Sequence, residues 1–164
     1  MKQIIFILTI FLFWSCGQIS ERKTENESSL TEIKEQNNII PKENALKFIN
    51  SYVENCNKMK ESLGLLEWVE SNNLTTKSFK SELKKIVDEA YKIDPEMGLD
   101  FDPIFNAQDY PEKGFEFESF DSNTNYLIVS GIEWSDFKLT IKMSYENKIW
   151  LIDGCGIINI PNNK

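Results

Sequence analysis

The fold is decided by residues 137–154, FKLTIKMSYENKIWLIDG, in which two apolar runs flank a short polar break. The first run alternates, and its apolar side chains are Phe137, Leu139, Ile141, Met143 and Tyr145. Alternation with a period of two is typical of a half-buried strand. Only Glu146-Asn147 separates this strand from the second run, KIWLIDG. So short a break predicts a tight antiparallel hairpin.

The segments before this hairpin predict two more strands and two helices. FEFESF (115–120) and YLIVSGI (126–132) have strand composition, whereas residues 94–114 contain three prolines and two glycines and predict a long loop. Upstream, apolar residues recur at helical spacing over 45–63, after Pro41, and over 79–91, after a cap at Thr75 or Thr76. LLEWVESNN, between them, predicts one more short helical turn. Helices followed by an antiparallel meander predict an α+β fold, with two helices packed on a curved sheet of about four strands.

Two of the predicted strands are apolar on both sides, although one layer of helices covers only one face of a sheet. We expect the face away from the helices to carry a candidate interface formed by Leu127, Val129, Ile149 and Leu151. A contiguous apolar patch of this kind marks a contact with a partner or a second copy of the chain. The alternative is that the loop over residues 94–114 covers this face with Phe101, Ile104 and Phe105.

The N-terminus, MKQIIFILTIFLFWSC, has one lysine, an eleven-residue apolar run and a cysteine. The run is too short to span a bilayer, and it has the order of a secretory signal peptide. We expect a signal peptide over residues 1–15, a lipidated Cys16 with a flexible polar tether over 16–40, and a single α+β domain over 41–160. This arrangement predicts export to the bacterial cell envelope, with a lipid anchor in the inner or outer membrane.

The composition excludes several kinds of chemistry. The chain has no histidine, which rules out Ser-His-Asp triads and histidine-containing zinc sites. Its net charge of −8 argues against a nucleic-acid partner. Cys56 and Cys155 remain as a pair in an oxidising compartment, where they form either a disulfide or two separate buried thiols. Strict alternation turns Cys155 away from the helices, and a bulge at Gly154-Cys155-Gly156 would turn it inward.

The acidic loop invites a comparison with calcium sites, because Asp94, Glu96, Asp100 and Asp102 stand at alternate positions. The EF-hand pattern fails, since Leu99 or Phe105 would occupy the position that requires glycine. We expect instead that Asp102, Gln108 and Asp109 hydrogen-bond to backbone groups and fix the loop, and that the protein holds no metal or cofactor.

An enzymatic alternative is a carboxylate base in a dry pocket, as in isomerases and dehydratases. Its candidate residues are Asp109 or Asp153, paired with Tyr126 or Tyr145. Aromatic side chains that would line a ligand pocket, or would simply be core, are Phe115, Phe117, Trp134 and Trp150.

Two segments, FDPIFNAQDYP (101–111) and KIWLIDG (148–154), resemble the family called domain of unknown function 3828 over about residues 42–158. The residues that carry the resemblance are Asp102, Pro103, Gln108, Asp109, Trp150 and Asp153. The resemblance implies a small exported bacterial protein, often a lipoprotein, with a nuclear transport factor 2-like fold in which helices pack into a curved sheet. The family has no established catalytic residues.

The sequence therefore predicts a non-enzymatic binding module of the cell envelope, for a protein partner or a small apolar ligand. A small enzyme and a toxin-immunity protein are the alternatives. A deep pocket with a buried carboxylate would favour the enzyme, and a filled core with an exposed apolar patch would favour a protein partner.

Overall fold

The computed structural model describes residues 41–161. Residues 41–56 are helical and are called here the leading helix. They are followed by the 3-10 turn η1 (Met59–Glu61), α2 (Leu65–Ser71) and α3 (Lys77–Ile93). Four strands complete the order: β1 (Phe115–Asp121), β2 (Tyr126–Gly131), β3 (Lys138–Glu146) and β4 (Ile149–Cys155). The protein is thus α+β, and the predicted signal peptide, Cys16 and most of the tether lie outside the described residues.

The four strands form one antiparallel sheet in the order β1-β2-β3-β4, so the predicted meander is confirmed. The last hairpin differs by one residue from the sequence prediction. Glu146 pairs with Ile149, and the turn residues are Asn147 and Lys148, with φ of 50° and 68°. A two-residue turn that follows the twist of its strands needs positive φ at both central positions. Asparagine adopts that conformation readily, and Lys148 is carried into it by the strands on either side.

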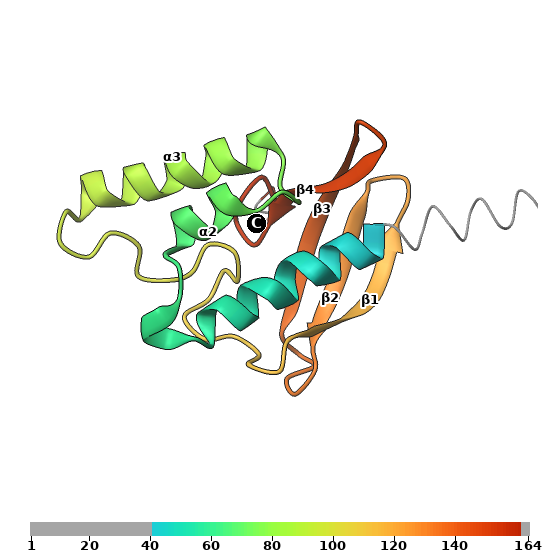
Figure 1. Cartoon of the computed structure of the whole chain (residues 1–164), viewed down its shortest axis with the longest axis horizontal. Helices are drawn as coiled ribbons and strands as arrows, with labels where there is room; N and C mark the ends of the chain where they lie inside the picture. Colours follow the sequence, from blue (N-terminus) through green and yellow to red (C-terminus); the bar gives the residue numbers. More distant parts are fainter. Residues whose placement is uncertain (1–40, 162–164) are drawn as a thin grey trace, which may run out of the picture. The chain divides into compact units, whose positions relative to one another are not determined.

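The leading helix lies across the sheet (Figure 1). It buries the apolar side chains of Ala45, Phe48, Ile49, Tyr52 and Val53. Asn44 Nδ2 donates to the Trp150 carbonyl at 2.8 Å, and Asn50 both donates to the Phe115 carbonyl and accepts from its N–H. These amides fix the helix to the outer strands β4 and β1. The predicted stripe extended too far, because the helix ends at Cys56 and Met59 takes a φ of 52°.

The assignment of Leu127 and Val129 to the open face of the sheet is wrong. Both are fully buried on the face under the leading helix, because they pair with Ile141 and Leu139, whose side chains belong to that face. Paired residues of neighbouring strands have their side chains on the same face of the sheet, so the register of β2 with β3 places Leu127 and Val129 on the helix-covered face.

Ile149 and Leu151 do lie on the opposite face, across from Glu146 and Ser144. Ile149 is exposed and Leu151 is partly buried. The loop residues Ile104 and Phe105 are buried under the leading helix, where Phe105 packs on the ring of Tyr52. This loop therefore completes the main core.

A bulge turns Cys155 inward, as the alternative in the sequence analysis required. The register of β3 and β4 shifts between Lys142 and Met143, which leaves Asp153 as the extra residue. Cys155 then lies opposite Ile141 and is fully buried. The bulge residue is Asp153, one position before the predicted glycine segment.

The helices α2 and α3 lie beyond β4 and do not cover the sheet (Figure 1). The segment just before α3 extends the sheet edge: Thr75 forms a parallel bridge with Ile152, and the Thr76 N–H donates to the Ile152 carbonyl at 2.9 Å. Thr76 is also the N-cap of α3, so one of the two predicted caps is confirmed.

Candidate functional site

Asp102 fixes the long loop, as predicted. Its Oδ1 accepts the backbone N–H groups of Ile104 at 2.8 Å and Phe105 at 3.1 Å, and its Oδ2 accepts the Tyr52 hydroxyl at 2.5 Å. The backbone N–H of Asp102 donates to the Ala107 carbonyl at 2.9 Å, which closes residues 102–107 into a compact turn. Such a turn ties the loop to the leading helix through one carboxylate.

The other members of the loop motif have unequal roles. Pro103 is buried, and its carbonyl accepts the N–H of Ile157 at 3.0 Å. Gln108 Nε2 donates to the Asp100 carbonyl at 3.1 Å. Asp109 is exposed and makes no side-chain hydrogen bond to another residue in the described part of the chain, so its predicted fixing role is not seen.

Burial dominates the electrostatics around Asp102. It raises the pKa of the Asp102 carboxyl, and it raises the pKa of the Tyr52 hydroxyl, to which the neighbouring carboxylate adds. Burial and then the charge of Asp102 raise the pKa of the Cys56 thiol to about 11. Full burial also raises the pKa of the Cys155 thiol. Both thiols therefore stay protonated near neutral pH, and neither is activated as a nucleophile.

Of the two alternatives for Cys56 and Cys155, the structure has two separate free thiols and no disulfide between them. Cys155 Sγ donates to the Ile104 carbonyl at 3.5 Å, inside the core. Cys56 is half-buried at the last position of the leading helix. The hydrogen-bond partner of the buried Cys155 thiol is therefore Ile104, in the turn that Asp102 anchors.

The proposed catalytic pairs do not assemble. Asp153 accepts the Thr76 hydroxyl at 2.8 Å and forms an ion pair with Lys142 at 2.8 Å. No hydrogen bond within residues 41–161 joins Asp109 or Asp153 to Tyr126 or Tyr145. The bulge explains the role of Asp153, because the extra residue points its carboxylate at the cap of α3.

The acidic loop does not form a cation site. Asp94 Oδ1 accepts the N–H groups of Glu96 and Met97, both at 3.0 Å, which caps the turn after α3. Among residues 41–161, no group of three or more histidine, cysteine, aspartate or glutamate side chains is placed to hold a metal ion.

The candidate aromatic residues are mostly core or rim. Phe115 is fully buried, and Phe117 is partly buried with Lys42 Nζ 4.7 Å from its ring centre. Trp150 packs on Phe120, and the exposed Trp134 packs on the edge of Phe137. Phe115 therefore belongs to the core, Phe117 and Trp150 pack against it, and Trp134 is exposed.

An apolar groove that the sequence analysis missed lies between α2, α3 and the turn after α3. We call it the α2–α3 groove. It encloses about 310 Å³ and is lined by Leu65, Leu66, Glu67, Val87, Tyr91, Met97 and Leu99, with Gly64 at its end. Large apolar side chains are also exposed near it in sequence, namely Leu63 and Ile93. Tyr91 is the last apolar residue at helical spacing in α3, and Asp94-Pro95, which ends the helix just beyond it, is the sequence signal that it lies near a free helix end.

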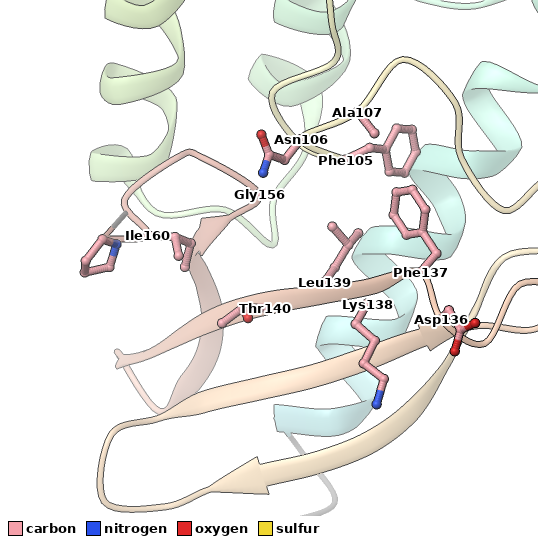
Figure 2. Close-up of a pocket in the computed structure, with 11 residues that line it drawn as sticks. Phe105, Asn106, Ala107, Asp136, Phe137, Lys138, Leu139, Thr140, Gly156 and Ile160 are labelled. Atoms are coloured by element: carbon pink, nitrogen blue, oxygen red, sulfur yellow. The ribbon is translucent and has the colours of Figure 1, made fainter. Parts of the chain in front are cut away.

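A larger cavity of about 620 Å³ lies beside the first residues of β3 (Figure 2), and we call it the β3-edge cavity. Its walls are the loop residues Phe105, Asn106 and Ala107, residues 136–140 at the start of β3 and just before it, and the tail residues Gly156, Ile160 and Pro161. Figure 2 shows Phe137 and Leu139 pointing toward the loop, with Lys138 pointing away from it.

Comparison of the chain with protein-family models, with curated proteins and with solved structures gave no match. Within residues 41–161, no helix has both the length and the apolar character needed to cross a membrane. The geometry of the chain itself is therefore the basis for inferring its function.

Proposed function

We propose that this protein is a cell-envelope lipoprotein, anchored through Cys16, which acts by binding a protein partner in the α2–α3 groove. The observation that carries the proposal is a core of buried side chains combined with exposed apolar side chains around one groove. Exposed apolar side chains cost free energy in water, and a cluster of them beside a groove usually marks an interaction site.

The geometry favours this function over an enzyme. Asp102 is partly buried, and its two oxygens are engaged by the Tyr52 hydroxyl and two backbone N–H groups. It lines neither cavity. A general base needs access to a substrate proton, and an aspartate enclosed in a turn does not have it.

The geometry also favours a protein over a small apolar ligand. Ligand pockets usually bury most of the surface of their ligand. The α2–α3 groove, at about 310 Å³, is at the small end of the size range of such pockets. Tyr91 and Met97, in its wall, are themselves exposed, and a methionine adapts its shape to an apolar partner side chain.

Charge indicates the chemistry of the partner. The only charged side chain in the groove wall is Glu67, and Asp94 and Glu96 lie just before Met97 in the chain. The whole chain carries a net charge of −8. We propose a partner segment with an apolar side and basic flanks, since opposite charges speed association and select the partner.

We also propose that the fold belongs to the nuclear transport factor 2-like class, and the chain to the family of unknown function 3828. The leading helix lying across a four-stranded antiparallel meander supports this proposal. The buried Asp102-Pro103 turn supports it too, since these residues carry the resemblance.

The experiment is site-specific photo-crosslinking of the full chain in living cells, with the photoreactive residue at Met97. We expect a crosslinked protein product that is lost in the Tyr91→Ser variant. Ile132→Ser is the matched control, because Tyr91 and Ile132 are both 52% exposed and only Tyr91 lines the groove.

A product that survives Tyr91→Ser, or that forms equally from a photoreactive residue at Ile132, would show that the groove is not the contact surface. A product with the mass of two copies of this chain would identify a homodimer in place of a heterologous partner.

A further inference from the structure

The pairing of β4 with β3 does not reach the first three residues of β3. The last pair of the two strands is Ile141 with Cys155, after which the chain turns at Gly156, whose φ is 61°. Residues Lys138, Leu139 and Thr140 still pair with β2 on their other side. The start of β3 is therefore a sheet edge, although β3 is an inner strand over the rest of its length.

The backbone groups at this edge face the β3-edge cavity. In an antiparallel strand, the N–H and C=O of one residue point to the same side, and successive residues alternate. The Gly131 N–H donates to the Phe137 carbonyl, so the backbone N–H and C=O groups of Leu139, two residues on, also point to β2. The backbone groups of Lys138 and Thr140 then point away from β2, and both residues line the cavity.

The N–H groups of Lys138 and Thr140 have no backbone partner on this side in the described part of the chain. The pairs of β3 with β4 end at Ile141, and no turn or loop hydrogen bond joins these two N–H groups. An unpaired edge of this kind is a template for another strand.

The walls of the cavity match the two sides of an added strand. Phe137 and Leu139 point toward Phe105, so a residue placed opposite Leu139 would meet apolar rings (Figure 2). The Lys138 side chain points the other way and forms an ion pair with Glu118 at 2.5 Å. A residue opposite Lys138 or Thr140 would therefore lie on the polar face of the sheet.

We propose that the β3-edge cavity binds an extended segment of a partner polypeptide as a fifth strand beside Lys138–Thr140. The segment is about three or four residues long, with an apolar side chain opposite Leu139 and polar side chains on either side of it. This inference goes beyond the α2–α3 groove, because it uses a different surface and a different mode of recognition. In strand addition, backbone hydrogen bonds give affinity and side-chain pockets give specificity.

A second copy of this chain does not fit as the occupant. Each copy would bring its own loop 105–107 and its own tail residues Ile160 and Pro161 against the same edge. Two such edges therefore do not approach each other, whereas a single extended segment does fit between the loop and the tail.

The experiment uses linear heptapeptides, selected from a phage-displayed library on the full chain in detergent micelles. We expect the selected peptides to alternate apolar and polar residues and to slow amide hydrogen exchange at Lys138 and Thr140, measured by NMR. Their affinity should fall roughly five- to tenfold in Thr140→Pro, the fold-change expected for one hydrogen bond. Proline lacks the N–H and is tolerated at a strand edge that faces away from its neighbour.

Thr140→Val is the matched control and should bind within twofold of the wild type, because it keeps the N–H and the side-chain shape. A peptide methylated on single backbone nitrogens tests the same bond without changing the protein, so the proposal stays testable if Thr140→Pro does not fold. The proposal is overturned if no selected peptide protects Lys138 and Thr140, or if every methylated peptide binds as well as its parent. Protection confined to the α2–α3 groove would also overturn it, while leaving the proposed function intact.

Discussion

The two halves of α3 carry apolar residues at the same helical spacing, yet Val87 is the last of them that the core buries. Phe79 and Leu83 are fully buried, whereas Tyr91 is 52% exposed and Ile93 is 86% exposed. The helix starts at the edge of β4, next to Ile152, and its second half continues past the sheet (Figure 1). Helical periodicity therefore predicts which side of a helix is apolar, but not how far along that side there is something to pack against.

One end of α3 therefore contributes to stability, and the other end contributes to the proposed binding function. The first half holds α3 to the sheet, and its side chains are fixed by packing. The second half, with α2 and Met97, leaves apolar surface in water. The predictions that follow start from this division and are given in order of decreasing effect.

The largest effect is expected from Phe79→Ala. Phe79 is fully buried and packs edge-on against Phe48 of the leading helix, with ring centres 5.7 Å apart. Its truncation should lower the free energy of unfolding by about 3–5 kcal/mol, from lost burial and the cavity left behind. Urea denaturation followed by circular dichroism measures the change.

Ile93→Ala is the control on the other half of the helix, and it should change the free energy of unfolding by no more than about 0.5 kcal/mol. Comparable losses from both variants would contradict the division of α3. The second half would then be part of the folding core, and the case for a binding groove there would fail.

The second prediction concerns Asp102, in the loop that brings the chain back from the free end of α3 to the core. Asp102→Ala removes the acceptor of two backbone N–H groups and of the Tyr52 hydroxyl. Leaving partly buried donors unsatisfied should cost about 1–3 kcal/mol of stability. Tyr52→Phe removes one of the three bonds and should cost less. An equal cost would mean that the carboxylate serves the tyrosine alone.

The same carboxyl predicts a pH dependence. Burial raises the pKa of Asp102, so the folded protein holds this proton more tightly than the unfolded chain does. Its contribution is therefore fully present below the unfolded pKa and is lost as the pH rises through the folded pKa. The unfolding free energy of the wild type minus that of Asp102→Asn should thus decrease from about pH 3 to pH 7. An increase over that range would show that the hydrogen bonds outweigh the burial.

Local patterns in the sequence predicted most of the fold. The errors arose where the pairing between strands determines which face of the sheet a residue is on or where a turn begins. The alternation in FKLTIKMSY predicted β3 and its apolar side correctly. YLIVSGI is apolar on both sides, so only its register with β3 shows that Leu127 faces the core. The hairpin register was also wrong, because the positive φ of Lys148 moved the turn by one residue.

The candidate sites divide in the same way. The role of Asp102 was predictable, because a short carboxylate beside a proline and a turn acts on its own neighbourhood in sequence. The α2–α3 groove and the β3-edge cavity were not predictable. The groove depends on where α3 ends, at Ile93, relative to α2. The cavity depends on where β4 ends, at Cys155, relative to the start of β3.

The smallest effect is expected from Thr76→Ala, at the point where the packed half of α3 begins. Thr76 Oγ1 accepts the Phe79 N–H at 3.0 Å and donates to Asp153 at 2.8 Å, so it joins the helix cap to the bulge of β4. Loss of a threonine cap costs about 1 kcal/mol. Thr76→Ser keeps the hydroxyl and should recover most of the loss.

The Thr76 variants also test whether α3 is held at one end only. Asp153 also forms an ion pair with Lys142 at 2.8 Å, so the bulge itself should persist when the hydroxyl is removed. Amide hydrogen exchange should then accelerate in the first turns of α3, and exchange around Ile93 should hardly change, because that end makes no use of the cap. Faster exchange along the whole helix would mean that its two halves unfold as one unit, and that the free end depends on the sheet for its structure.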